Sequence, residues 1–242
     1  MRKKGIITLL TFCITACMLS GCTAKESKSS ATKENTEISS NNDTYESSIQ
    51  VGAIIKFGTY EQDGNISNGS EPIEWSVLAI EDNKALVISK YVLDWKQYHE
   101  VSEKTSWSNC GLRTWLNGDF YSQAFNTDEK GKIEATTITT KDDSSENQVF
   151  ILNKSELEKY FYSDDDRISE PTEVVKDSAK NTNNTTFENG EGCWYWGCGK
   201  GTYDFAPYVS KKGRLGDNTS DNTDYVERYY GVRPAIWIEI GN

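Results

Sequence analysis

The sequence predicts a mixed α+β fold, built as a single domain over residues 49–242. Short runs rich in β-branched and aromatic residues, separated by turn-forming residues, dominate this part of the chain. Two short segments instead carry helical spacing or a helix cap. The length, about 190 residues, suits one domain better than two. We therefore expect mixed, mostly antiparallel sheets with two or more short helices.

The strand candidates are short and are spread over the whole domain. Residues 73–77 alternate polar and apolar side chains, as a half-buried strand does, and the run continues to Ile80. Asp82-Asn83 supplies a turn between this segment and residues 85–89, so the two segments predict a hairpin. The other predicted strands are residues 53–60, 135–140, 148–152, 206–210 and 232–240.

Two helices are predicted between these strands. Residues 112–116 place Leu, Trp and Leu at i, i+3 and i+4, with Ser108 or Asn109 as the N-cap and Gly118 as the stop signal. Ser155–Glu158 has the pattern of a capping box, which starts the second helix. Residues 164–190 are polar and poor in aromatic residues, so we interpret them as a long surface insertion.

The first 48 residues predict export and membrane anchoring. A basic start and an apolar run to Leu19 are typical of a secretory signal. The run has about 15 apolar residues, fewer than the ~20 that span a bilayer. Leu19-Ser20-Gly21-Cys22 resembles the bacterial lipobox, in which the cysteine is lipidated. We therefore expect a signal peptide at 1–21, a disordered tether at 22–48, and a lipid on Cys22 that holds the protein at the extracytoplasmic face of the cell membrane.

The charge of the chain excludes one class of partner. Removal of residues 1–21 takes away three basic residues and moves the formal charge from −11 to −14. Nucleic-acid binding depends on clustered Lys and Arg, which so acidic a chain lacks, so we predict no nucleic-acid partner.

Five short strings, taken in order, resemble a bacterial domain family of unknown function that is frequent in extracytoplasmic proteins of Gram-positive bacteria. That family is similar to C-type-lectin-like domains, among them the formylglycine-generating enzymes and the variable receptor-binding proteins of phages. The resemblance implies a single C-type-lectin-like domain, with the first and last strands side by side and the helix at 112–116 packed on the sheet. The strings are Phe57–Tyr60, Ile73–Leu78, Leu112–Asn117, Val149–Leu152 and Gly231–Ile238.

The chain departs from that family at residues 192–199, where relatives tend to read Trp-x-Leu-Arg-Ser-Pro-Gly. Here Cys193 and Cys198 appear five residues apart, which is the spacing of the catalytic pair in the copper-dependent formylglycine-generating enzymes. Two thiolates can hold Cu(I), so one hypothesis is a copper-dependent oxidase. The alternatives, which we favour, are free thiols or a disulfide, either between these two or with Cys110.

The aromatic residues in the same segment predict a binding surface. Trp194 and Trp196 alternate along a short strand, with Tyr203 nearby, and such rings suit sugars, peptides or protein partners. No cofactor and no metal site is predicted: His99 is the only histidine, and the acidic loops lack the spacing of a known calcium loop. The function we expect is a lipid-anchored module that binds an unknown surface ligand. The alternatives are the copper-dependent oxidase and a structural envelope lipoprotein.

Overall fold

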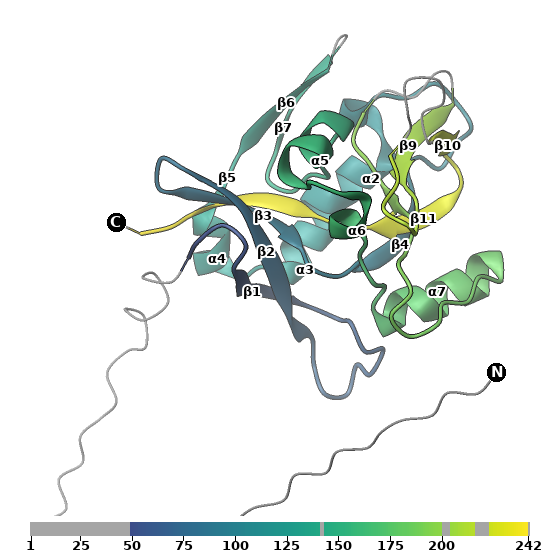
Figure 1. Ribbon diagram of the computed structural model, residues 1–242, viewed down its shortest axis with the longest axis horizontal. Coiled ribbons are helices and arrows are strands. Elements are labelled where there is room, and N and C mark those ends of the chain that lie inside the picture. The colour runs from purple at the N-terminus through teal and green to yellow at the C-terminus, as the bar shows by residue number, and fades with distance from the viewer. Residues whose placement is uncertain (1–48, 141–142, 200–203, 216–222, 242) are drawn as a thin grey trace, which may run out of the picture. The chain divides into compact units, whose positions relative to one another are not determined.

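The computed structural model describes residues 49–140, 143–199, 204–215 and 223–241, which form a mixed α+β fold with mostly antiparallel sheets (Figure 1). This confirms the predicted fold class. The strands are β1 (Ile54–Tyr60), β2 (Glu71–Glu81), β3 (Lys84–Ser89), β4 (Asp94–Gln97), β5 (Ile133–Glu134), β6 (Thr136–Thr140), β7 (Asp143–Asn147), β8 (Tyr195–Trp196), β9 (Phe205–Val209), β10 (Thr223–Tyr225), β11 (Tyr229–Val232) and β12 (Ala235–Glu239). The helices are η1 (Trp107–Asn109), α2 (Gly111–Trp115), η2 (Leu116–Phe120), α3 (Tyr121–Ala124), α4 (Thr127–Lys132), α5 (Lys154–Tyr160), α6 (Asp164–Arg167) and α7 (Glu173–Asn183).

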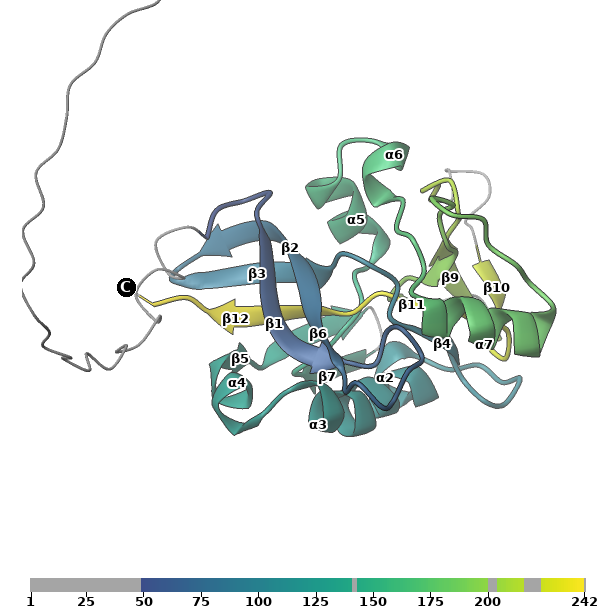
Figure 2. The same ribbon diagram turned by 90° about the horizontal axis from the view of Figure 1, so that it is seen from below.

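Two five-stranded sheets organise the described residues. The first has the order β1-β2-β3-β12-β5 and the second the order β10-β9-β8-β11-β4, while β6 and β7 form a separate hairpin. Figure 2 shows α3 and α4 on one side of the first sheet and α5 and α6 on the other, with the second sheet and α7 at one end. The predicted hairpin is confirmed as β2–β3, in which Val77 pairs with Val87 and both are buried.

The chain passes from one sheet to the other at two neighbouring places. One crossing lies between β3 and β4 and the other between β11 and β12, and they are joined where Leu93 N–H donates to Val232 O at 2.9 Å and Ser89 N–H donates to Pro234 O at 2.8 Å. Pro234 lacks an N–H, so it suits a point where the ladder of one sheet ends and that of the next begins.

Arg233 explains part of the Gly-Val-Arg-Pro-Ala string, because its side chain is buried at this junction. Its Nε donates to Ser89 O at 2.8 Å, and its guanidinium lies 5.4 Å from the ring centre of Phe161 and 5.5 Å from that of Tyr195. Gly231 comes just before, where an added Cβ would collide with a Val92 methyl and lie 2.6 Å from Trp194 O. The string therefore holds the two sheets together at close range.

Three helical predictions differ from the structure. Cys110, not Ser108 or Asn109, is the N-cap of α2: its sulfur accepts the Arg113 N–H at 3.3 Å. The helix also does not stop at Gly118, because η2 continues it in order to bury Leu116 and Phe120.

The second helix starts two residues earlier than predicted. Its capping box is formed by Asn153 and Glu156, which exchange bonds with each other's N–H, rather than by Ser155 and Glu158. Asn153, two residues upstream of Ser155, offers an equally good cap, so local sequence alone does not choose between them.

Three further expectations also need correction. Residues 149–152 are buried but make only a single bridge, from Phe150 to Ala235, instead of a strand. Residues 164–190 are not only a surface insertion, because α6 and α7 lie within them and α7 buries Val175 and Ala179. The first and last strands share a sheet but are not neighbours, since β2 and β3 lie between β1 and β12.

Among the described residues, no helix has both the length and the apolar character needed to cross a membrane.

Candidate functional site

A hollow of about 260 Å³ lies where the second sheet meets the end of α7, and we call it the aromatic pocket. Four rings and four polar side chains from segments far apart in the sequence contribute to it. The lining residues are Trp95, Asn183, Thr185, Trp194, Asp224, Arg228, Tyr229 and Tyr230.

Strand register and one helix end bring these residues together. Gly231 of β11 pairs with Trp95 of β4 on one side and with Tyr195 of β8 on the other, so the segments that carry the rings run next to each other. Helix α7 ends at Asn184, whose left-handed backbone (φ 52°) turns the chain back toward the pocket. The Trp95 Nε1–H donates to Thr182 Oγ1 at 2.9 Å, which fixes the indole against α7.

Aromatic contacts hold the pocket walls. The rings of Trp95 and Tyr230 meet edge to face at 6.3 Å, and the Trp194 ring lies 5.9 Å from that of Phe187. Trp95 is buried, whereas Trp194 and Tyr230 are half-buried. The hollow thus has a fixed ring at its base and partly accessible rings at its sides.

The polar groups of the pocket differ in what they already bind. Both carboxylate oxygens of Asp224 accept bonds, one from the Tyr230 hydroxyl at 2.7 Å and one from the Tyr225 N–H at 2.8 Å. Burial, followed by the hydrogen bond and the charge of Asp224, raises the pKa of Tyr230 above its usual range, so this hydroxyl stays protonated. Asn183 donates from Nδ2 to Tyr229 O at 3.3 Å.

Arg228 differs from these groups because its guanidinium has no bonded partner among the described residues. The side chain is exposed, and within the described ranges it makes neither a hydrogen bond nor an ion pair. Its positive charge lowers the pKa of the Tyr230 hydroxyl, against the larger effects that raise it.

The predicted ligand-binding residues fall in three different places. Trp194 lines the pocket. Trp196 is only 1% exposed, donates from Nε1 to Lys96 O at 2.9 Å, and packs 4.7 Å from Tyr230, one layer below the pocket. Trp196 therefore cannot touch a ligand there and acts as a support for Tyr230. Tyr203 and the predicted lipid anchor Cys22 lie outside the described residues.

The three cysteines of the domain are free thiols, so no disulfide joins them. Cys193 and Cys198 flank the two ends of β8: Cys193 N–H donates to Ser169 O, and Cys198 N–H donates to Leu152 O. Between them, Tyr195 and Trp196 are extended and pair with Val209 and Tyr208, so the chain runs away from Cys193 before it reaches Cys198. The linear thiolate pair that the copper hypothesis needs is thus not brought together.

Burial has the same effect on all three thiols. It raises the pKa of Cys110 to about 12 and those of Cys193 and Cys198 well above the usual range, so each is a protonated, unreactive side chain near neutral pH.

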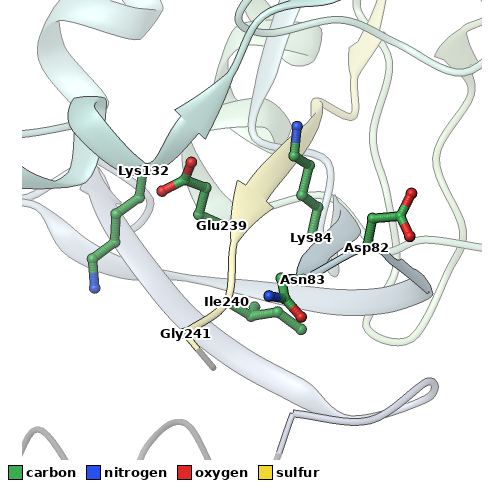
Figure 3. Close-up of a pocket in the computed structure, with 7 residues that line it drawn as sticks. All are labelled: Asp82, Asn83, Lys84, Lys132, Glu239, Ile240 and Gly241. Carbon is green, nitrogen blue, oxygen red and sulfur yellow. The ribbon is translucent and has the colours of Figure 1, made fainter.

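Two other hollows lie on the first sheet and are rich in paired charges. One, of about 420 Å³, is lined by side chains that Figure 3 shows extending in different directions, with the Lys84 and Lys132 amines pointing apart. Lys84 is paired with Glu134 at 2.9 Å, and no aromatic side chain lines this hollow. The other, of about 340 Å³, has Trp237 as its one ring. The aromatic pocket is therefore the better candidate site.

One acidic group could in principle hold a cation. Glu61, Asp63 and Glu71 place oxygens within 4.8 Å of one another. Their oxygens already accept N–H groups of the same loop, for example Glu71 Oε2 from Gln62 at 2.8 Å and Asp63 Oδ1 from Asn65 at 2.7 Å. The cluster thus shapes the turn between β1 and β2.

Most of the pocket residues are not among those predicted from the sequence. Trp95 is not among them, and neither is Arg228-Tyr229-Tyr230, directly before the Gly231 string. Two adjacent tyrosines beside an arginine at the start of a strand were a usable signal, because one of two successive strand residues faces away from the core. Asn183 carried no such signal, since only the fold of α7 brings it near.

The fold and the pocket define a mixed α+β domain with an aromatic, partly open hollow. The family model described as "Domain of unknown function (DUF6273)" matches residues 82–240, about two thirds of the chain, and the chain belongs to this family. The match begins after the end of β2, so two of the five strings that suggested a family lie outside it. No curated protein and no solved structure matches the chain.

Proposed function

We propose that this chain is a ligand-binding module held on the extracytoplasmic face of the cell membrane by a lipid on Cys22. The observation that carries the binding role is the aromatic pocket, in which rings and hydrogen-bonding groups from four separate segments converge. Binding sites commonly have this composition: apolar and aromatic walls with a few placed polar groups. The half-buried state of Trp194, Tyr229 and Tyr230 supports the proposal, because it leaves parts of these rings accessible.

The binding role is tested with the full-length protein and its tryptophan fluorescence. Titration with panels of oligosaccharides and peptides should find ligands that change the emission, and Trp194→Ala should abolish their binding. Trp237→Ala is the matched control, since Trp237 is also half-buried and also lines a hollow, but on the first sheet. If no ligand is found, or if both variants bind equally well, the pocket has no binding role and a structural envelope lipoprotein becomes the better description.

The anchoring role rests on the lipobox-like Leu19-Ser20-Gly21-Cys22. A Cys22→Ala variant should leave the membrane fraction or remain unprocessed, because it has no thiol to lipidate. A variant that stays in the membrane with unchanged gel mobility would refute the anchor. The matched control is Cys17→Ala, which removes a thiol inside the expected signal peptide and should behave as the parent protein.

A relationship to C-type-lectin-like domains is also part of the proposal. It is supported by the mixed α+β fold with mostly antiparallel sheets, although the expected pairing of the first and last strands is not present, since β2 and β3 lie between β1 and β12. The copper-dependent oxidase is not proposed, since Cys193 and Cys198 lie at opposite ends of β8.

A further inference from the structure

We propose that the aromatic pocket binds an acidic sugar residue, that is, a carbohydrate ring that carries a carboxylate. This inference rests on the proposed binding role and names the class of ligand for the same site. It is carried by three properties of the pocket: its size, its available charge and the kind of groups that line it.

The size of the pocket limits what can enter. Pockets that enclose whole drug-sized ligands measure about 300–1,000 Å³, whereas this one is about 260 Å³ and is open to solvent on one side. It is therefore suited to one residue of a longer molecule, such as a single sugar ring, with the remainder lying outside.

The lining carries one acid, Asp224, and one cation, Arg228. Asp224 keeps its negative charge, but each of its oxygens already accepts a hydrogen bond, one from Tyr225 and one from Tyr230. Lys211, whose ammonium lies 5.2 Å from the Trp194 ring centre, is paired with Glu191. Arg228 is the lining cation that no described group engages, and a guanidinium fork matches a carboxylate in two parallel hydrogen bonds. An anionic group on the ligand would pair with the Arg228 guanidinium.

This charge stands out against the rest of the molecule. The whole chain has a formal charge of −11, so its general field repels anions. A carboxylate-bearing ligand therefore needs a local cation, and Arg228 provides one at the pocket rim.

The lining groups favour a sugar over a peptide. Flat indole and phenol rings complement the C–H face of a sugar ring, while the Asn183 amide and the Thr185 hydroxyl can bond to its hydroxyls. Extended peptides commonly bind by adding a strand to a sheet edge. Here β4 is the edge strand of its sheet, but the pocket takes its lining from β4, from β11 and from the end of α7, so it lies on the face of the sheet rather than along the outer edge of β4.

The test compares ligands that differ only in charge. Oligosaccharides of galacturonic, mannuronic and glucuronic acid are titrated into the full-length protein beside their methyl esters, with an acetylated tetraglutamate peptide as the peptide arm. At least one acidic oligosaccharide should bind about tenfold or more tightly than its ester, as expected for a charge-assisted bidentate contact. Raised salt should weaken the binding of the acidic oligosaccharide and leave the binding of its ester unchanged.

Variants assign this preference to one side chain. Arg228→Gln should bind acid and ester equally, and Arg228→Lys should retain part of the preference because it keeps the charge without the fork. Lys132→Gln removes one exposed charge that lines the hollow of Figure 3 and should leave the preference intact.

The outcomes separate this inference from the proposed function. If acids and esters bind equally well through Trp194, the ligand class is wrong although the binding role stands. If the preference survives in Arg228→Gln, Arg228 is not its source and the charge argument for this pocket is overturned. If the tetraglutamate peptide binds more tightly than every acidic oligosaccharide, the assignment to sugars is overturned. If no member of any panel binds, the binding role fails together with the inference.

Discussion

Trp194 and Trp196 are two residues apart, yet the structure predicts very different costs for removing them. Trp196→Ala deletes an indole that is 1% exposed, contacts the rings of Tyr98 at 5.6 Å and Tyr230 at 4.7 Å, and donates to Lys96 O. Truncation of a fully buried Trp lowers the free energy of unfolding by about 3–5 kcal/mol, because a cavity remains. For a domain of this size, the melting temperature should fall by about 6–20 °C.

Trp194→Ala should lower the free energy of unfolding much less than Trp196→Ala does. The ring is half-buried and keeps one ring contact with Phe187 and one ammonium contact with Lys211. Each contact stabilises by about 0.5–1 kcal/mol, so the expected loss is about 1–2 kcal/mol.

Urea unfolding followed by circular dichroism gives both values on the same scale. Trp196→Phe supplies an intermediate case, because it keeps a ring beside Tyr98 and Tyr230 but leaves the Lys96 carbonyl without its donor, at a cost of about 1–3 kcal/mol. The reasoning is refuted if Trp194→Ala costs as much as Trp196→Ala, or if Trp196→Ala costs less than about 2 kcal/mol.

Two further predictions concern a glycine and a thiol. Gly58→Ala should lower the free energy of unfolding by about 2 kcal/mol or more, since Gly58 has φ +69° and the new Cβ would lie 2.6 Å from Ala124 O. Gly118 is on a helix with open space around it, so Gly118→Ala should raise the free energy of unfolding by up to about 1 kcal/mol. Equal effects of the two variants in thermal melts would contradict this reasoning. Burial raises the pKa of Cys110 to about 12, so the folded state holds this proton more tightly than the unfolded state does. The resulting stability of the folded state is present below about pH 9 and is lost as the pH rises toward 12. The free energy of unfolding should therefore fall less steeply over this range in Cys110→Ala than in the parent, and identical slopes would show that the thiol does not contribute.

The predictions from sequence succeeded where the signal is local. The hairpin at 73–89 follows from alternation with period two and a two-residue turn, both of which are properties of adjacent residues. The helix after Cys110 likewise follows from the spacing of Leu112 and Leu116. The apolar run at residues 148–152 was predicted to be a strand, but a buried apolar run does not by itself distinguish a strand from the irregular core segment that the structure shows.

Helix α7 shows the limit of such patterns. Its sequence is polar, and only Val175 and Ala179 are buried, so no apolar stripe was visible. Its position depends on β4 and β11, where the Thr182 hydroxyl accepts the Trp95 N–H. Packing against partners distant in sequence therefore outweighed local composition.

The sequence by itself determined the class of fold, the hairpin, and the presence of large aromatic residues in the segment around Trp194. Only the tertiary structure decided that Trp196 is core, that Cys193 and Cys198 lie apart, and that Trp194 shares a pocket with Arg228. The physical reason is that exposure and proximity are properties of contacts between distant segments, here β4, α7, β8 and β11, whereas strand alternation and helix caps depend on neighbouring residues alone.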